Sequence, residues 1–427
     1  YEVKYKQFTS IPLNHWQQNG SLRLRLLLGL MENNTSCHGE VALKPSELHL
    51  ISAFLAMEPI GFLVSLAKQI GGGSVSEAVQ GFILNHCIST LSSDEDGNRV
   101  FLRTFVKKLI EDVEECGGVV VDDLYEQCGL LMASPEGGGL SKGCRRVCKQ
   151  ISFLREGSFK QPHFSKVVIP LYCSLNMLEG DTGCSVWPSS LYLSEFILSF
   201  PDLFTNRSCF EIGSGAGLVG ICLFHVKAST IILSDGDLST LANLKCNLDL
   251  NKVPHSGDIQ SIKMVKPAIE DISQLKILHL PWESASDSEL QQYTPDIILA
   301  ADVIYDPVCL PDLVRIIAIL LNPKHGCMTK GGDNRFSIPV DDNLGRSRDF
   351  SEEPHSNDLL DFGGRNFRVA YIASVIRNVD TFDYFVELSK QANLVVTDVT
   401  ESSMPLNFLP YMQTFDRGSI RLLKLTC

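Results

Sequence analysis

The sequence predicts an α/β fold: an open, mostly parallel, Rossmann-like sheet that follows an N-terminal helical domain. Three observations lead to this prediction. From residue 167 onward, short apolar runs alternate with helical patterns, as they do in a doubly wound sheet. A glycine-rich turn at residues 209–220 joins one such run to a helical pattern. Between residues 47 and 134 the apolar residues recur mainly at helical spacing.

Length, charge and cysteine usage narrow the class of protein. A chain of 427 residues suggests two or three domains. The net charge of −13 argues against a general nucleic-acid binder, because such a protein carries a basic face. The 14 cysteines include no Cys-x-x-Cys pair, which indicates a reducing, cytoplasmic location and no metal site. No apolar run is long enough to predict a membrane span.

The chain is predicted to have four consecutive parts. They are a poorly ordered segment at 1–46, a helical domain at 47–134, a linker at 135–166 and a cofactor-binding domain at 167–427. The clearest helix of the second part is Asn98–Glu114, and Ser76 is expected to cap a shorter one. Within the last part, residues 323–366 are polar and lack periodicity, which predicts a disordered insertion.

The strands of the last domain are predicted from short apolar runs between helical patterns. The runs are 167–171, the run entering the glycine turn, 230–234, 276–280, 296–301, 369–375, 394–399 and 419–425. The run at 296–301 is almost wholly apolar, as expected for a buried parallel strand. The two last runs are expected to form an antiparallel edge of the sheet.

The glycine turn predicts a nucleotide-cofactor loop, since glycine allows positive φ and close approach of the backbone to a ligand. Two cofactors fit the residues. Gly215-x-Gly217-x-x-Gly220 matches a dinucleotide fingerprint, whereas Glu211-x-Gly213-x-Gly215-x-Gly217 matches the form used for S-adenosylmethionine. Asp235, about 20 residues further on, suits the ribose hydroxyls of either cofactor. The turn alone therefore leaves both cofactors open.

Other strand ends should meet this loop, because ligands of open α/β sheets bind at the carboxyl ends of the strands. Trp282 offers a flat apolar face for adenine, and Asp302 and Tyr305 end the run at 296–301. A hydride-transfer enzyme needs a proton donor near its nicotinamide, and no His or Tyr/Lys pairing of that kind stands out. The strand ends therefore favour group transfer over an NAD(P)-dependent oxidoreductase.

These motifs together resemble the seven-β-strand lysine methyltransferases of the Asp-x-x-Tyr type. The resemblance is carried by Glu211-Ile-Gly-Ser-Gly-Ala-Gly-Leu-Val-Gly, Ser234-Asp235, Trp282 and Ala300-Ala-Asp-Val-Ile-Tyr305. It implies a class I methyltransferase sheet of seven strands. It also implies that S-adenosylmethionine contacts Trp187, Gly213, Ser214, Gly215, Asp235, Trp282 and Ala301. By the same resemblance, Asp302 and Tyr305 hold the target lysine.

A narrower resemblance concerns the substrate. Residues 204–207, 99–105 and 122–125 are similar to the members of this family that methylate elongation factor 2, a translation factor. This implies elongation factor 2 as the protein partner, with no nucleic-acid or membrane partner. The rival hypothesis is a methyltransferase-like binding protein that docks a translation factor without catalysis. The intact glycines, Asp235, Asp302 and Tyr305 argue against such a loss of catalysis.

Overall fold

The computed structural model describes residues 43–91, 96–133, 146–155, 165–174, 182–256, 259–261, 275–322 and 368–427. The chain divides into two compact units, Tyr1–Gly138 and Gly139–Cys427. The segment predicted to be poorly ordered, 1–46, lies outside the described residues up to residue 42. The insertion predicted at 323–366 lies wholly outside them.

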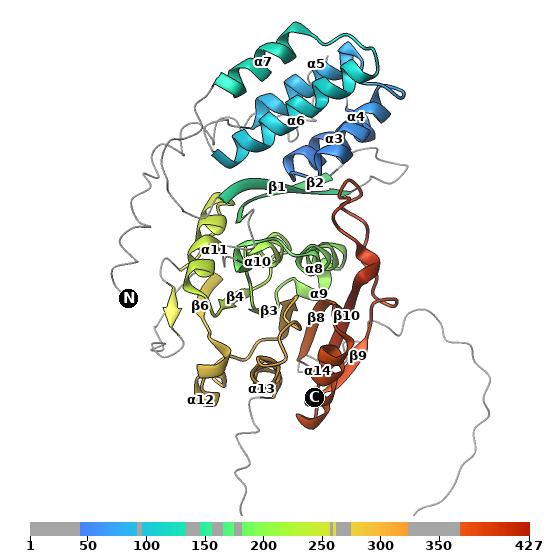
Figure 1. The fold of residues 1–427 in the computed structure, drawn as a ribbon. Coiled ribbons are helices and arrows are strands. Elements are labelled where there is room, and N and C mark those ends of the chain that lie inside the picture. Colours follow the sequence, from blue (N-terminus) through green and yellow to red (C-terminus); the bar gives the residue numbers. More distant parts are fainter. Residues whose placement is uncertain are drawn as a thin grey trace, which may run out of the picture. The chain divides into compact units, whose positions relative to one another are not determined.

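The described part of the first unit consists of helices (blue to teal in Figure 1). They are α3 (Pro45–Leu55), α4 (Ile60–Ile70), α5 (Glu77–His86), the 3-10 turn η1 (Ile88–Thr90), α6 (Asp96–Glu115) and α7 (Asp122–Ala133). Phe54 and Phe105 are fully buried and meet edge to face, with ring centroids 5.0 Å apart. The helix predicted at 98–114 is confirmed as α6. The predicted cap is also confirmed, since the Ser76 side chain accepts from the Val79 N–H.

A separate two-stranded antiparallel sheet opens the second unit. It consists of β1 (Arg146–Arg155) and β2 (Ser165–Ser174). The interpretation of 135–166 as a linker is therefore wrong for β1, and the run at 167–171 does not join the main sheet. Four consecutive buried residues, 151–154, conceal the alternation of a strand. They are buried by a distant segment: Ser152 N–H donates to Tyr411 Oη (2.8 Å) and Leu154 N–H to the Phe408 carbonyl (2.8 Å).

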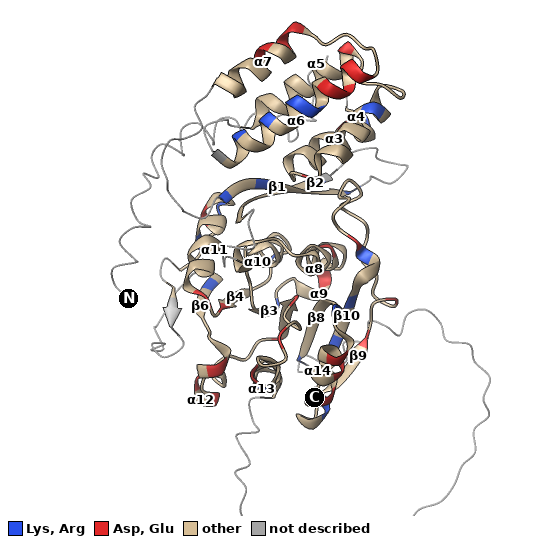
Figure 2. Ribbon diagram, viewed as in Figure 1, with Lys and Arg blue, Asp and Glu red and all other residues tan. Residues whose placement is uncertain are grey.

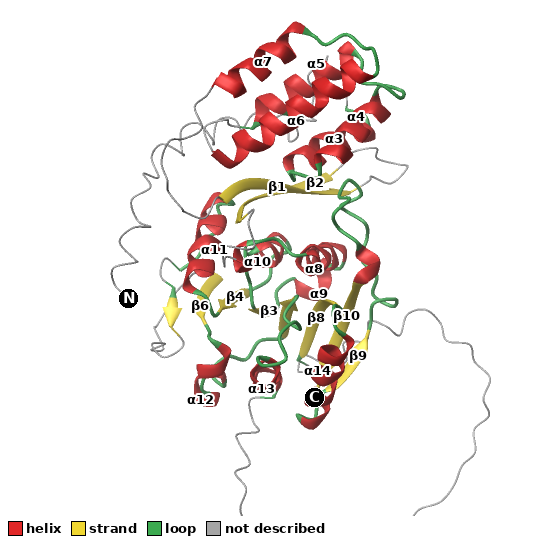
Figure 3. Cartoon of the chain, in the orientation of Figure 1, coloured by secondary structure: helices red, strands yellow, loops and turns green. Residues whose placement is uncertain are grey.

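The main sheet confirms the predicted seven-stranded Rossmann-like fold and adds one two-residue strand at its edge. Its order is β5-β6-β4-β3-β7-β8-β10-β9, and Figure 3 labels β6, β4, β3, β8, β10 and β9. The strands are β3 (Ser208–Ile212), β4 (Thr230–Asp235), β5 (Gln260–Ser261), β6 (Leu275–His279), β7 (Ile297–Ala301), β8 (Val369–Val375), β9 (Val395–Asp398) and β10 (Ile420–Thr426). The short strand β5 pairs with β6 outside the predicted set of seven.

The antiparallel strand lies inside the sheet rather than at its edge. The strands β6, β4, β3, β7 and β8 are parallel, while β10 pairs antiparallel with both β8 and β9. The prediction of an antiparallel edge is thus corrected: β10 is antiparallel, but β9 is the edge strand. After β8 the chain first forms the edge strand β9, and β10 then inserts between β8 and β9. Local periodicity does not encode this order.

Helices cover both faces of the main sheet (Figure 1). One layer consists of α8 (Pro188–Ser199), the short α9 (Pro201–Phe204), α10 (Leu218–His225) and α11 (Leu238–Leu250). The other consists of α12 (Asp287–Leu290), α13 (Leu310–Leu321) and α14 (Val379–Gln391). The apolar face of α13 packs on β7 and β8, with Leu313, Ile317 and Leu320 fully buried. Among the described residues, none of the helices is both long and apolar enough to cross a bilayer.

Candidate active site at the carboxyl edge of the sheet

The glycine turn follows β3 directly and is shaped by glycine-only geometry. Gly213, Gly215 and Gly217 have φ of 70°, 51° and 87°, in the left-handed region that favours glycine. A Cβ on Gly220 would lie 2.6 Å from both terminal carbons of Leu233 on β4. The start of α10 is therefore pressed against the sheet, and its N-terminal N–H groups face the carboxyl edge.

Hydrogen bonds from the next strand hold the turn in place. The Ser214 N–H donates to the Ser234 carbonyl (2.8 Å), and the Ser234 N–H donates to Ser214 Oγ (3.0 Å). The Gly215 N–H donates to Asp235 Oδ2 (3.1 Å), and the Asp237 N–H to Asp235 Oδ1 (3.1 Å). Burial raises the pKa of Asp235, although these two N–H groups lower it. The Asp235 carboxylate thus faces the glycine turn and keeps lone pairs open to a ligand.

Glu211 is the buried acid behind the turn. It lies on β3 with an exposed fraction of 2%, and its Oε2 has no hydrogen-bond partner among the described residues. Burial raises the pKa of Glu211 to about 8, although bonds from the Ser214 hydroxyl and the Gly220 N–H lower it. An unpaired charge is costly to bury, so a buried carboxyl group with an open acceptor is suited to pair with a cationic group of a ligand.

Trp282 lies beside the first glycine of the turn. It opens the 3-10 turn η5 (Trp282–Ser284), just beyond β6. A Cβ on Gly213 would lie 3.8 Å from Trp282 Cζ2 and 3.1 Å from Val303 Cγ1. Arg315 of α13 fixes this turn, because its guanidinium donates to the carbonyls of Trp282 (2.8 Å) and Ala285 (2.9 Å). The Trp282 indole, the glycine turn and Asp235 therefore come together, as the sequence predicted.

Asp302 follows Ala301, the last residue of β7, in a strained conformation. Its φ is 59°, which is uncommon for a residue with a side chain, and its N–H donates to the Ala373 carbonyl (2.9 Å). Its carboxylate accepts two hydrogen bonds from Arg377: Nη1 to Oδ1 (2.9 Å) and Nη2 to Oδ2 (2.9 Å). Such backbone strain is often found at functional sites. The Ala301 backbone lies next to Ala373 of β8 in the register.

Arg377 is a residue of this edge that the sequence analysis missed. It lies two residues after β8, and its guanidinium is 5.5 Å from the centre of the Trp187 ring. Trp187 precedes α8, and its Nε1–H donates to the Thr182 carbonyl (3.1 Å). Trp187 and Asp302 therefore meet through Arg377. Its position just after a predicted strand could have identified this residue, since β8 is parallel to β7 and both strands end at the same edge of the sheet.

Tyr305 is placed differently from Asp302. It lies three residues further along the chain, and 62% of it is exposed. Desolvation by neighbouring groups raises the pKa of Tyr305, and Cys309, Asp235 and Asp306 raise it further. The phenol thus stays neutral at neutral pH. The roles predicted for Asp302 and Tyr305 toward a lysine stay predictions.

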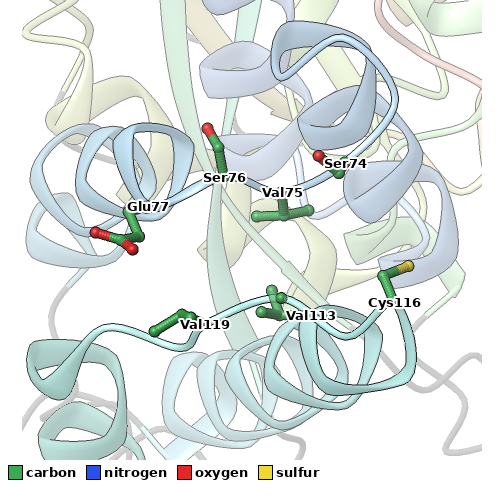
Figure 4. Close-up of a pocket in the computed structure, with 8 residues that line it drawn as sticks. Ser74, Val75, Ser76, Glu77, Val113, Cys116 and Val119 are labelled. Atoms are coloured by element: carbon green, nitrogen blue, oxygen red, sulfur yellow. The ribbon is translucent and has the colours of Figure 1, made fainter.

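A metal site and a pocket in the helical unit are two other kinds of candidate site. Within the described residues, no three His, Cys, Asp or Glu side chains are arranged to hold a metal ion. The helical unit contains a hollow of about 290 Å³ between the loop at 74–77 and the end of α6 (Figure 4). Glu77 and Cys116 are its titratable lining residues, and small or apolar side chains make up the rest. It lacks the glycine turn and paired acids of a nucleotide site.

The chain was compared with known families and proteins. Residues 171–332 match the family model described as lysine methyltransferase. An uncharacterized protein of Dictyostelium discoideum is 31% identical over 57% of this chain and 58% of its own length. The human protein-lysine N-methyltransferase EEF2KMT is 28% identical over 51% of this chain and 59% of its own length. The Chaetomium thermophilum protein-lysine N-methyltransferase EFM3 is 26% identical over 52% and 62%. The chain thus spans about three fifths of the length of these relatives.

Proposed function

Because residues 171–332 match the family model described as lysine methyltransferase, we propose that the protein transfers methyl groups from S-adenosylmethionine to a protein lysine. The observation that carries this proposal is the convergence of four features at one sheet edge. They are the buried acid Glu211, the glycine turn, the carboxylate of Asp235 and the Asp302–Arg377 pair.

The described residues fit S-adenosylmethionine as the cofactor. When bound, it supplies a methyl group on a positively charged sulfur that needs no further activation. Glu211 Oε2, buried and without a partner, suits the positively charged amino group of the cofactor. The open lone pairs of Asp235 suit the ribose hydroxyls, and the Trp282 ring offers an apolar face for adenine. The positive-φ glycines allow the cofactor to approach the backbone closely.

At the substrate end, the protein has to orient a neutral amine. A lysine with a pKa near 10.4 is only about 0.1% neutral at pH 7.4, a cost of roughly 4 kcal/mol. Asp302 and Tyr305 are the proposed lysine-binding residues, because they lie in the turn that follows the carboxyl end of the central strand β7. Asp302 would accept a hydrogen bond from the amine, and the exposed Tyr305 ring would face the methylammonium group, an interaction of roughly 0.5–2 kcal/mol.

For the substrate, we propose elongation factor 2. Support comes from the two relatives EEF2KMT and EFM3 and from residues of the helical unit that resemble that branch of the family. Acidic side chains on α12, α13 and α14 argue against a nucleic-acid substrate (Figure 2); they include Asp287, Glu289, Asp312, Asp380, Asp383 and Glu387. A translation factor as substrate would be met in the cytoplasm, which we propose as the location.

The test uses labelled S-adenosylmethionine in a cell extract that lacks the endogenous enzyme. Adding the protein should label elongation factor 2, and mass spectrometry should place the label on a lysine. Labelling of another protein, with elongation factor 2 unlabelled, would contradict the substrate but keep the reaction. Absence of any transfer, with the cofactor still bound by calorimetry, would favour the alternative of a binding protein without catalysis.

A further inference from the structure

At the proposed lysine site, the carboxylate of Asp302 is already paired with Arg377. The Asp302 side chain is 4% exposed, and each of its oxygens accepts a hydrogen bond from the guanidinium. The Arg377 side chain is 44% exposed and lies between this carboxylate and the Trp187 ring. An incoming lysine at Asp302 therefore meets a carboxylate whose charge is already compensated.

The charge of the Asp302 carboxylate is compensated by Arg377. The other titratable groups at or just beyond the carboxyl ends of the strands include Glu211, Asp235, Asp237, His279, Glu283, Tyr305, Asp306 and Asp398, and Arg421 of β10 pairs with Asp398. Apart from His279, Tyr305 and Arg421 these are carboxylic acids, and His279 is engaged with the Gly236 carbonyl (3.0 Å). Among the described residues, the ion pair that Asp302 makes is with Arg377. Without that guanidinium, a lysine would face an uncompensated carboxylate.

An uncompensated carboxylate works against the transfer. A carboxylate within about 4–6 Å of an amine favours the ammonium form and raises the amine pKa by about 1–3 units. Only the neutral amine has the lone pair that forms the N–CH3 bond, while the S–CH3 bond breaks and its electron pair stays on sulfur. The ammonium proton must therefore leave to water before the transfer. A fixed guanidinium beside the carboxylate removes this obstacle and still leaves the carboxylate as a hydrogen-bond acceptor.

We propose that Arg377 is a positioning residue that holds Asp302 and cancels its charge, so that the target lysine can lose its proton. This inference rests on the proposed lysine methyltransferase activity. The Trp187 ring holds the guanidinium in place on its other side. Arg377 thus acts through Asp302, without itself contacting the reacting atoms.

The test is the pH dependence of methyl transfer to whichever protein the parent enzyme labels, at saturating S-adenosylmethionine. In Arg377→Met the pH of half-maximal rate should rise by about 1–3 units, so that the rate is lost at neutral pH and recovered at alkaline pH. Arg377→Lys keeps the charge and should keep the parent profile, even where its rate is lower. Arg421→Met is the matched control: Arg421 is 43% exposed, pairs with Asp398 of β9, and should leave the profile unchanged.

Chemical rescue gives a second readout. Guanidinium ion, added to Arg377→Ala below the concentrations that unfold the protein, should restore transfer at neutral pH and move the profile back. A profile of Arg377→Met that coincides with the parent profile overturns the proposal and leaves a structural ion pair. Faster transfer by Arg377→Met at neutral pH also overturns it, because Arg377 would then block the lysine site. If the parent enzyme labels no protein, the proposed function itself fails, which is a separate outcome.

Discussion

At the scale of single residues, Asp235 is expected to do two things: fix the glycine turn and bind the cofactor. Its carboxylate accepts from the Gly215 and Asp237 N–H groups and keeps lone pairs for two ribose hydroxyls. Asp235→Ala should weaken S-adenosylmethionine binding by about 2–4 kcal/mol, measured by calorimetry, because two bonds to a charged acceptor are lost. Asp249→Asn is a suitable control, since Asp249 is 55% exposed and pairs with His255. Unchanged affinity in Asp235→Ala would contradict the assignment.

Glu211 predicts how stability changes with pH. Burial raises the pKa of Glu211 in the folded protein from its ordinary value of 4.5 to about 8, so the folded protein holds a proton that the unfolded chain releases. The contribution of this bound proton to the free energy of unfolding is fully present below about pH 4.5 and is lost as the pH rises through about 8. Glu211→Gln cannot ionise, so its melting temperature should fall less than that of the parent between about pH 5 and pH 8. Parallel curves for the two proteins would show that Glu211 is ionised in the folded state throughout this range.

The cofactor should change this behaviour. A cationic amino group beside Glu211 Oε2 favours the carboxylate form, so binding of S-adenosylmethionine should release a proton below pH 8. Calorimetry at about pH 7 in two buffers of different ionisation enthalpy would measure this release. The release should be absent in Glu211→Gln. Equal apparent enthalpies in the two buffers for the parent protein would argue against contact between Glu211 and the cofactor.

At the scale of elements, α11 ties the β1–β2 hairpin to the glycine turn. Asn247 is fully buried: its Oδ1 accepts from the Tyr172 N–H (2.7 Å), and its Nδ2 donates to the carbonyls of Tyr172 (3.2 Å) and Ala216 (2.9 Å). One turn to either side, Asn243 donates to the Tyr172 carbonyl and Asn251 to the Pro170 carbonyl. These three residues form one polar stripe, four residues apart, that faces the hairpin.

Removal of the Asn247 hydrogen bonds should lower both the stability of the fold and the affinity for the cofactor. Asn247→Ala should lower the free energy of unfolding by about 2–4 kcal/mol, because three hydrogen bonds of this buried side chain, to the Tyr172 N–H and to the carbonyls of Tyr172 and Ala216, are lost. Asn251→Ala, at the partly exposed end of the stripe, should cost less. Urea denaturation measures both, and calorimetry should show weaker cofactor binding for Asn247→Ala. Equal stability of the two variants would mean that the hairpin is held mainly by other contacts.

At the scale of the whole molecule, we expect the two units to have different functions, namely substrate recognition and methyl transfer. The edge that carries the proposed chemistry lies in Gly139–Cys427, while the helical unit ends at Gly138. We expect the helical unit to recognise the folded substrate. A chain that begins at Gly139 keeps both strands of the hairpin, since β1 starts at Arg146. It should bind S-adenosylmethionine as the full chain does, but methylate elongation factor 2 poorly.

A cooperative urea transition must first show that the shortened chain folds. Full activity of that chain on elongation factor 2 would refute a recognition role and leave the helical unit with a structural one. Loss of both cofactor binding and activity, in a chain that still unfolds cooperatively, would show that the helical unit supports the cofactor site.

The local parts of the site could be predicted from the sequence. The glycine turn, Asp235 and Trp282 each stand at the end of an apolar run, and the structure brings them to one edge. The run at 369–375 coincides with β8 in both of its ends. These predictions are confirmed because they depend on contacts within a strand–turn–helix unit, where residue spacing and backbone geometry are directly coupled.

What the sequence alone determined is thus the class of fold, the cofactor turn and the strand ends, since apolar periodicity and glycine placement act over a few residues. Only the tertiary structure decided that Arg377 pairs with Asp302, 75 residues earlier, and that β10 lies between β8 and β9. The structure also showed that Arg146–Arg155 form a strand. This strand is covered by the segment that contains Phe408 and Tyr411, which is distant in the sequence. Such pairings arise when distant segments bury each other's polar groups, and the burial depends on the whole fold.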